Sequence, residues 1–164
     1  TDAYPNWLTP NAQHHADVDL HDKPGRQSRV GPYISFDAYS TISVAGAVAL
    51  TKRLSLATAD VQRKLGFVPE RGRVQLFTQR GPAMRPSMED GDVAFIDTSV
   101  TAFVADDCYL VQMGQMLQLK RLQRRGDQVW VISGNDQFPS WPWTEESDLT
   151  IRGKLVLRLA LHAA

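Results

Sequence analysis

The sequence predicts a mostly β domain of antiparallel strands with one short helix, preceded by an extended linker. Three observations predict it: strand-like runs recur through the second half of the chain, glycine-containing turns separate them, and only one segment reads as a helix. The chain has 164 residues, the usual length of one domain, and can bury a core of its own.

Residues 1–35 are expected to form a flexible linker. The first 30 residues carry prolines, asparagines, histidines and scattered charges without helical or strand periodicity. Six of them could be considered as metal ligands, namely His14, His15, Asp17, Asp19, His21 and Asp22. No ligand-pair spacing repeats and no cysteine joins them, so we expect a solvated linker and no metal site.

Residues 36–164 are expected to form the folded domain. The segment 30–50 is apolar and β-branched, and 55–67 predicts a helix that Thr58 caps and Gly66 ends. Tight turns at Met113–Met116 and Arg125–Asp127 predict two hairpins. The remaining strand-like runs are 73–80, 92–99, 108–113, 116–122, 128–133 and 149–161.

Composition limits the classes of function. The chain has 18 basic and 18 acidic residues and so lacks the positive surplus that gives non-specific affinity for nucleic acid. Cys108 is the single cysteine, which excludes an internal disulfide. No stretch is long and apolar enough for a signal peptide or a membrane span, so we expect a cytoplasmic protein that does not bind a membrane. Helix-turn-helix, phosphate-loop and zinc motifs are also absent from the sequence.

Lys120 lies inside the predicted strand 116–122. Alternation places it on one face with Met116, Gln118 and Leu122. One interpretation is a surface lysine that extends its amine to solvent. The other is a general base, which requires that burial lower the lysine pKa from its ordinary value of about 10.4. Such a base also needs a hydroxyl to activate, held on a rigid turn.

The stretch 80–93, "RGPAMRPSMEDGDV", places two methionines among glycines and prolines and closes on an acidic turn. With "YLVQMGQMLQLKRL", "VISGNDQFP" and "IRGKLVL" further on, it resembles the LexA-like family of Ser-Lys self-cleaving peptidases. That family includes the C-terminal regulatory domains of phage repressors and the UmuD-like proteins. The resemblance runs from about residue 36 to residue 158, and it implies a LexA-like C-terminal peptidase domain.

The resemblance also implies a set of site residues. Ala83 stands at the nucleophile position, where the family has serine, and Lys120 at the position of the general base. The bond Ala45–Gly46 matches the self-cleavage site: Ala45 precedes Ala83 by 38 positions, and Lys120 follows it by 37 (83 − 45 and 120 − 83). The turn that presents the nucleophile matches at Gly81, Met84, Pro86, Gly91 and Asp92.

Ala83 has no hydroxyl, so this chain is expected not to hydrolyse a peptide bond by the family's mechanism. Ser87 is close in sequence, but it aligns with the Thr or Ser that follows the proline and is expected to point away from Lys120. Pro82 has no N–H, which makes the N–H of residue 83 the natural oxyanion donor. Two explanations fit Ala83: a deliberate serine-to-alanine change that keeps the chain uncut, or a natural domain that keeps the shape without cutting.

By resemblance, the chain is the self-cleavage and dimerisation domain of a phage-type or SOS-type transcriptional repressor. The RecA filament on single-stranded DNA would promote its cleavage, and DNA would be bound by a helix-turn-helix domain upstream of Thr1. A homodimer or higher homo-oligomer is implied, and no cofactor. The alternatives are a non-cleaving module controlled by an antirepressor protein and a UmuD-like accessory subunit of a translesion polymerase.

Two apolar groups have either a core or a partner-binding interpretation. The closing strand could fill the core or form a dimer surface, with the residues Leu155, Val156, Leu157, Leu159 and Leu161. Aromatic residues near the end of the chain could pack on the core and turns, as we expect, or form a partner patch: Trp130, Phe138, Trp141 and Trp143.

Overall fold

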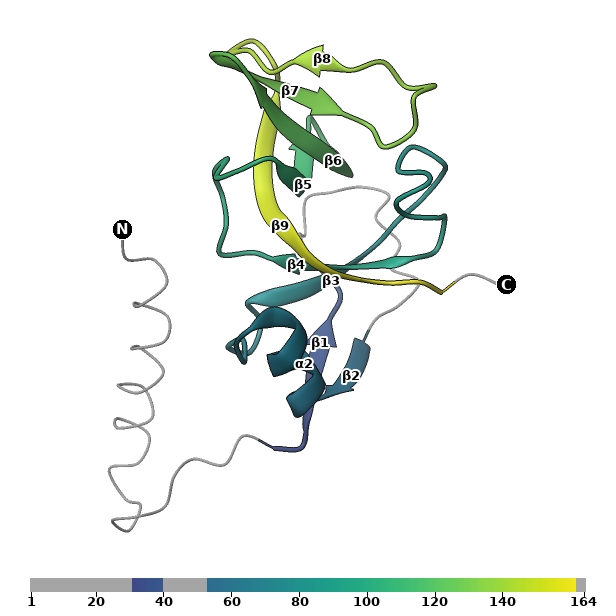
Figure 1. Ribbon diagram of the computed structural model, residues 1–164, viewed down its shortest axis with the longest axis vertical. Coiled ribbons are helices and arrows are strands. Elements are labelled where there is room, and N and C mark those ends of the chain that lie inside the picture. The colour runs from purple at the N-terminus through teal and green to yellow at the C-terminus, as the bar shows by residue number, and fades with distance from the viewer. Residues whose placement is uncertain (1–30, 40–52, 162–164) are drawn as a thin grey trace.

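The computed structural model describes residues 31–39 and 53–161 (Figure 1). In this part of the chain the only helix is α2 (Thr58–Leu65). The strands are β1 (Tyr33–Asp37), β2 (Arg53–Ala57), β3 (Val74–Thr78), β4 (Val93–Asp97), β5 (Asp107–Met113), β6 (Met116–Arg125), β7 (Gln128–Ile132), β8 (Trp141–Pro142) and β9 (Leu149–Leu159). The predicted fold class, mostly antiparallel β with one short helix, is therefore confirmed.

The main sheet has seven strands in the order β3-β4-β9-β5-β6-β7-β8, and every neighbouring pair is antiparallel. β9, the last strand in the chain, lies between β4 and β5 and pairs with both. Figure 1 shows it as the long yellow strand that passes from the β8 end of the molecule to the β3–β4 end. The two halves of the sheet are therefore joined through the C-terminal strand.

A smaller unit, made of β1, β2 and α2, packs beside β3 at the end of the molecule opposite β8 (Figure 1). A parallel bridge pairs Ala38 with Leu76 of β3, and the Tyr39 N–H donates to the Leu76 carbonyl at 2.7 Å. Phe36 of β1 and Val61 of α2 are buried against the core side chains of β3 and β4. The hydrophobic core thus continues from the small unit into the main sheet.

The helix is shorter than the sequence predicts. Residues 55–57 belong to β2, because pairing with β1 holds them extended, and the helix begins only at Thr58. The prediction that Thr58 is the cap was wrong: Ala57 is the N-cap, and the Thr58 hydroxyl donates to the Gly31 carbonyl at 2.6 Å. The predicted end is confirmed, since Gly66 adopts the left-handed conformation with φ 83°.

Both predicted hairpins are confirmed. Met113 pairs with Met116 around Gly114, and Arg125 pairs with Gln128 around Gly126. β6 extends three residues beyond its predicted end, to Arg125. The short strands β2 and β8 were not predicted. β8 has two residues, one of them proline, and only its pairing with β7 makes it a strand.

The apolar residues of the closing strand are mostly used in the core. Leu155 packs on the cluster that contains Met84, while Val156, Leu157 and Leu159 pack on the cluster that contains Phe36. Leu161 is 51% exposed. Trp141 and Trp143 pack on the cluster around Leu122 and Val131, in agreement with the expected core packing, but Phe138 is 39% exposed. Use of this strand in a dimer stays a prediction.

Candidate functional site

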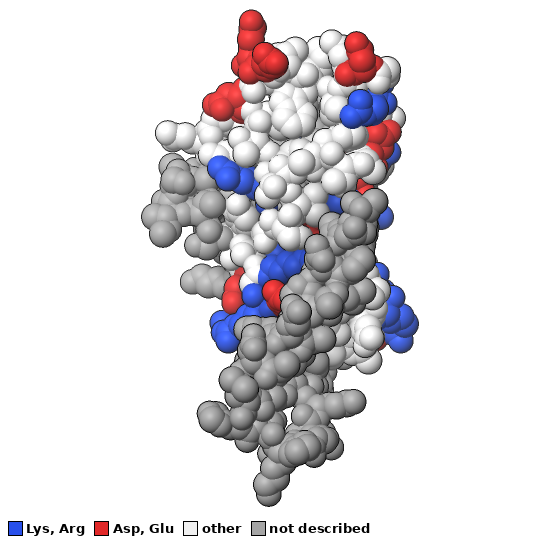
Figure 2. All heavy atoms as spheres, turned by 90° about the vertical axis from the view of Figure 1, so that its left-hand side faces the viewer, with Lys and Arg blue, Asp and Glu red and all other residues white. Residues whose placement is uncertain are grey.

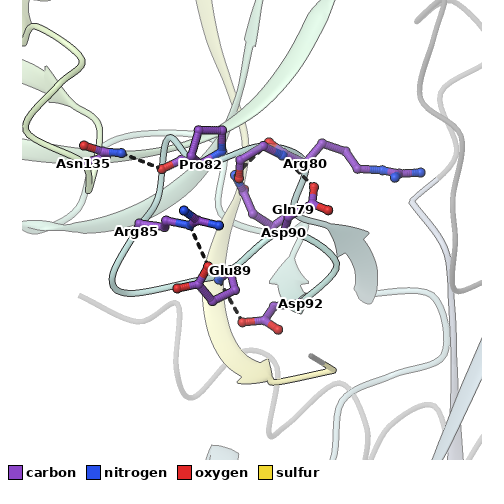
Figure 3. Close-up of polar contacts among 9 residues, drawn as sticks. Gln79, Arg80, Pro82, Arg85, Glu89, Asp90, Asp92 and Asn135 are labelled. Atoms are coloured by element: carbon purple, nitrogen blue, oxygen red, sulfur yellow. Dashed lines mark hydrogen bonds and ion pairs between the residues drawn. The ribbon is translucent and has the colours of Figure 1, made fainter. Parts of the chain in front are cut away.

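The segment 79–92, here called the corner, leaves the sheet after β3 and returns to it at β4. Its base closes through two backbone hydrogen bonds of 2.8 Å, from the Gln79 N–H to the Asp92 carbonyl and from the Gly91 N–H to the Gln79 carbonyl. Inside it, the Gly81 N–H donates to Asp90 Oδ1 at 2.8 Å (Figure 3). Gly81 and Gly91 have φ of 77° and 90°, values that favour glycine, so the predicted turn positions have a backbone reason.

The corner is anchored in the core. Met84 and Met88 are almost fully buried among apolar side chains of β4, β5 and β6. Asp92 is buried as well, and its carboxylate accepts from the Glu89 N–H at 2.9 Å and from the Leu161 N–H at 3.0 Å. The predicted residues Met84 and Asp92 therefore fix the corner to the sheet and to the segment after β9. Pro86 is exposed on its surface.

Ala83 lies in the part of the corner formed by residues 82–84, here called its tip, and is half-buried. Its carbonyl accepts a hydrogen bond from the Asn135 N–H at 2.9 Å, and the Asn135 side-chain amide donates to the Pro82 carbonyl at 3.1 Å (Figure 3). Within residues 31–39 and 53–161, the Ala83 N–H donates no hydrogen bond. Its role as a donor to an oxyanion stays a prediction.

Lys120 lies in the middle of β6 and is only 8% exposed. Its Nζ donates to Ser133 Oγ at 2.7 Å, and Ser133 is buried too. Burial lowers the pKa of the Lys120 amine below its ordinary value, because desolvation disfavours the charged form. In the described part of the chain Lys120 forms no ion pair that would oppose this effect. The surface interpretation of Lys120 is therefore wrong.

One loop contacts both halves of the predicted dyad. Ser133 accepts from Lys120, and two residues later Asn135 binds the carbonyls of Pro82 and Ala83. Between them, Gly134 lies directly on the corner: a Cβ there would be 2.8 Å from the Met84 carbonyl oxygen. The tripeptide 133–135 thus connects the Lys120 amine to the tip of the corner.

Ser133 and Asn135 were not identified as site residues from the sequence, although a signal for Ser133 was present. The predicted hairpin makes the strands of Lys120 and Ser133 neighbours but does not fix their register; counting back from the observed pair Arg125–Gln128 brings Lys120 opposite Ser133. No comparable count reaches Asn135, because it contacts the corner through a loop outside any strand pairing.

Two other side chains, Ser87 and Cys108, carry potential nucleophiles. Ser87 is exposed, and its carbonyl accepts a hydrogen bond from Arg158, while the Lys120 amine is directed to Ser133. Cys108 is half-buried, and burial raises the pKa of its thiol, with the Asp107 charge acting in the same direction. A raised pKa disfavours the thiolate that would attack a carbonyl. Neither side chain therefore replaces a hydroxyl at residue 83.

Several other sequence predictions concern residues away from this site. The bond Ala45–Gly46 and the linker histidines lie outside the described residues. In the described ranges no three His, Cys, Asp or Glu side chains gather as a metal site, and no helix is long and apolar enough to span a bilayer. Figure 2 shows one face of the molecule. Acidic side chains lie at its β8 end, and below them scattered basic and acidic side chains lie among a larger uncharged area.

The sequence is similar to a known protein family and to a phage protein. A family model described as Peptidase S24-like matches residues 44–156, a range that contains the corner, Lys120 and the tripeptide 133–135. The chain is also 33% identical over 90 residues to a 26 kDa repressor protein of Escherichia phage HK022. That alignment covers 54% of this chain and 38% of the phage protein.

Proposed function

Because this chain belongs to the Peptidase S24-like family, we propose that it is the self-cleavage and dimerisation domain of a transcriptional repressor, disabled by Ala83. The observation that carries the proposal is the loop 133–135, which binds both the buried Lys120 amine and the tip of the corner at residue 83. The similarity to a phage repressor protein supports the regulatory role.

With serine at residue 83, the chemistry would proceed in two stages. The hydroxyl oxygen attacks the carbonyl carbon of Ala45, and neutral Lys120 takes the hydroxyl proton. The carbon–nitrogen bond to Gly46 then breaks, and Lys120 gives that proton to the departing amine. Water attacks the resulting ester with Lys120 again as base, so that a carboxylate end and the free residue-83 hydroxyl are formed.

The corner supplies the second requirement of this reaction, stabilisation of the oxyanion. The N–H of residue 83 has no acceptor in the described part of the chain and can donate to the developing charge. The segment around Ala45 would enter the site as an extended strand, paired with a strand next to the corner. Because nucleophile and target bond belong to one chain, no diffusional encounter is needed.

The proposed trigger is the RecA filament on single-stranded DNA. It would act by favouring the state in which the segment around Ala45 occupies the site, which is a population shift between two arrangements of one segment. Cleavage would separate this dimerising domain from a DNA-binding domain, through which alone the repressor would contact its operator. The balanced charge of this chain fits that division of labour.

The test is to restore the hydroxyl with Ala83→Ser and to determine the masses of the products after incubation at pH 7 and at about pH 10, with and without RecA filaments. We expect two fragments that meet between Ala45 and Gly46. The matched control, Ala83→Ser with Lys120→Ala, should cleave at least about 100-fold more slowly, the usual contribution of a positioned base.

Ala83 itself favours a second candidate function. A domain that lacks the hydroxyl but keeps the anchored corner can serve as a non-cleaving oligomerisation module whose repressor is released by an antirepressor protein. This candidate predicts that the Ala83→Ser chain stays intact at both pH values and with RecA filaments.

A further inference from the structure

We infer that the tripeptide Ser133–Gly134–Asn135 is a clamp that sets the position of the Lys120 amine relative to residue 83. Ser133 and Asn135 are then positioning residues for the reaction. This inference rests on the proposed self-cleavage. The clamp itself, however, is a set of contacts that exists in the chain with Ala83 and can be measured there.

Ser133 holds the amine end of the clamp. The serine directly follows β7, whose pairing with β6 places it opposite Lys120, and both side chains are buried. Tyr109 of β5 is opposite Lys120 on the other side, but its hydroxyl donates to the Ala105 carbonyl at 2.7 Å. With the ammonium donating to Ser133 Oγ, the hydroxyl selects one direction for the flexible lysine side chain.

Asn135 holds the corner end. Its N–H and its side-chain amide bind the consecutive carbonyls of Ala83 and Pro82, and its Oδ1 accepts from the Gln137 N–H at 3.0 Å. The carbonyl contacts orient the peptide units on both sides of the nucleophile position. They therefore set the direction of the residue-83 side chain and N–H without using either as a hydrogen-bonding partner.

Gly134 sets the spacing between the two ends. A Cβ at this position would be 2.8 Å from the Met84 carbonyl oxygen, closer than real Cβ contacts occur, and 3.0 Å from the carbonyl carbon. These are backbone atoms of a corner anchored by Met84 and Met88, so they cannot move aside easily. Glycine is required here for close approach, since its backbone is not in a left-handed conformation.

The first experiment measures self-cleavage against pH in the Ala83→Ser chain. Adding Ser133→Ala should lower the maximal rate by about 10- to 100-fold, the scale of effect of a misplaced reacting group. It should also move the midpoint of the pH–rate curve to lower pH, because the Lys120 ammonium loses a hydrogen-bond acceptor. Ser133→Thr restores the hydroxyl and should restore both, while Ser140→Ala, an exposed serine of the same loop, should change neither.

Asn135→Asp provides a contrasting variant. It keeps an acceptor for the Gln137 N–H but removes the amide that donates to Pro82. We expect a lower maximal rate and a midpoint at higher pH, opposite to the shift in Ser133→Ala, because the new carboxylate favours the charged form of Lys120. Gly134→Ala should also lower the maximal rate without moving the midpoint, because it displaces the corner instead of the amine.

The second experiment uses the chain with Ala83 and needs no cleavage. The Asn135 amide should be protected from hydrogen exchange and should lose protection in Gly134→Ala, and an NMR titration should show a lower Lys120 pKa in Ser133→Ala. If Ala83→Ser is inert while these measurements hold, the proposed function fails and the clamp stands. If Ala83→Ser cleaves but Ser133→Ala changes neither maximal rate nor midpoint, or if the Asn135 amide exchanges freely, the clamp is wrong.

Discussion

At the scale of single residues, Lys120 shows what sequence patterns can and cannot say about a buried charge. Its place on a strand among partly apolar neighbours could be predicted from alternation, but its burial could not, because a surface lysine fits the same pattern. The 2.7 Å contact with Ser133 follows from the β6–β7 register, in which Arg125 pairs with Gln128; the predicted hairpin makes the two strands neighbours but does not fix this register. The contact between Asn135 and Ala83 could not be predicted from the sequence patterns, because it depends on how a loop folds back on the corner.

Met84 shows how a residue next to the nucleophile position serves the site through packing. Met84→Ala should lower the free energy of unfolding by about 2 to 5 kcal/mol, because it leaves a cavity in a fully buried cluster. The matched control is Met116→Ala, since Met116 is 60% exposed, and it should change stability by less than about 0.5 kcal/mol. Urea unfolding measures both. Equal effects of the two substitutions would show that the corner is not anchored in the core.

At the scale of elements, a largely buried ion pair joins the start of β3 to the end of β4. Arg73, just before β3, binds Asp97 at the end of β4 through two hydrogen bonds of 2.9 and 3.0 Å, and Ser99 also donates to the same carboxylate. Burial acts to raise the pKa of Asp97, but these hydrogen bonds and the guanidinium charge outweigh it, so the pKa lies below its ordinary value.

Asp97→Asn should therefore lower the free energy of unfolding by about 3 kcal/mol at pH 7, because it leaves the Arg73 charge without its carboxylate. Asp37→Asn breaks the exposed pair with Arg53 and should cost less than about 0.5 kcal/mol. Similar losses in the two variants, measured by urea unfolding, would contradict the assignment of β3–β4 stability to the buried pair.

The same pair predicts a pH dependence. The Asp97 carboxylate has a lower pKa in the folded chain than the value of about 3.9 in the unfolded one. Its contribution to stability is therefore fully present above about pH 4 and is lost as the pH falls through the folded pKa. The difference in unfolding free energy between the parent chain and Asp97→Asn should shrink below pH 4. A difference that stays constant down to pH 2 would contradict the lowered pKa.

At the scale of the whole molecule, the sequence predicts most strands and both hairpins, because each depends on local alternation and turn residues. The order of the strands is not a local property: β9 enters between β4 and β5, far from either in sequence. The strands β2 and β8 escape prediction for a related reason, since each is defined by the partner it pairs with. The site depends on this long-range order, because β6, the corner and the loop after β7 meet only in the folded sheet.

The measurement that tests the account most directly is the pH dependence of self-cleavage in the Ala83→Ser chain. We expect a rate that rises with pH to a midpoint below the ordinary lysine value of about 10.4, since burial lowers the pKa of Lys120, and cleavage at least about 100-fold slower in the added variant Lys120→Met. A chain that stays intact at every pH, a rate that does not depend on pH, or cleavage at an undiminished rate in Lys120→Met would contradict a site in which buried Lys120 activates a hydroxyl at residue 83.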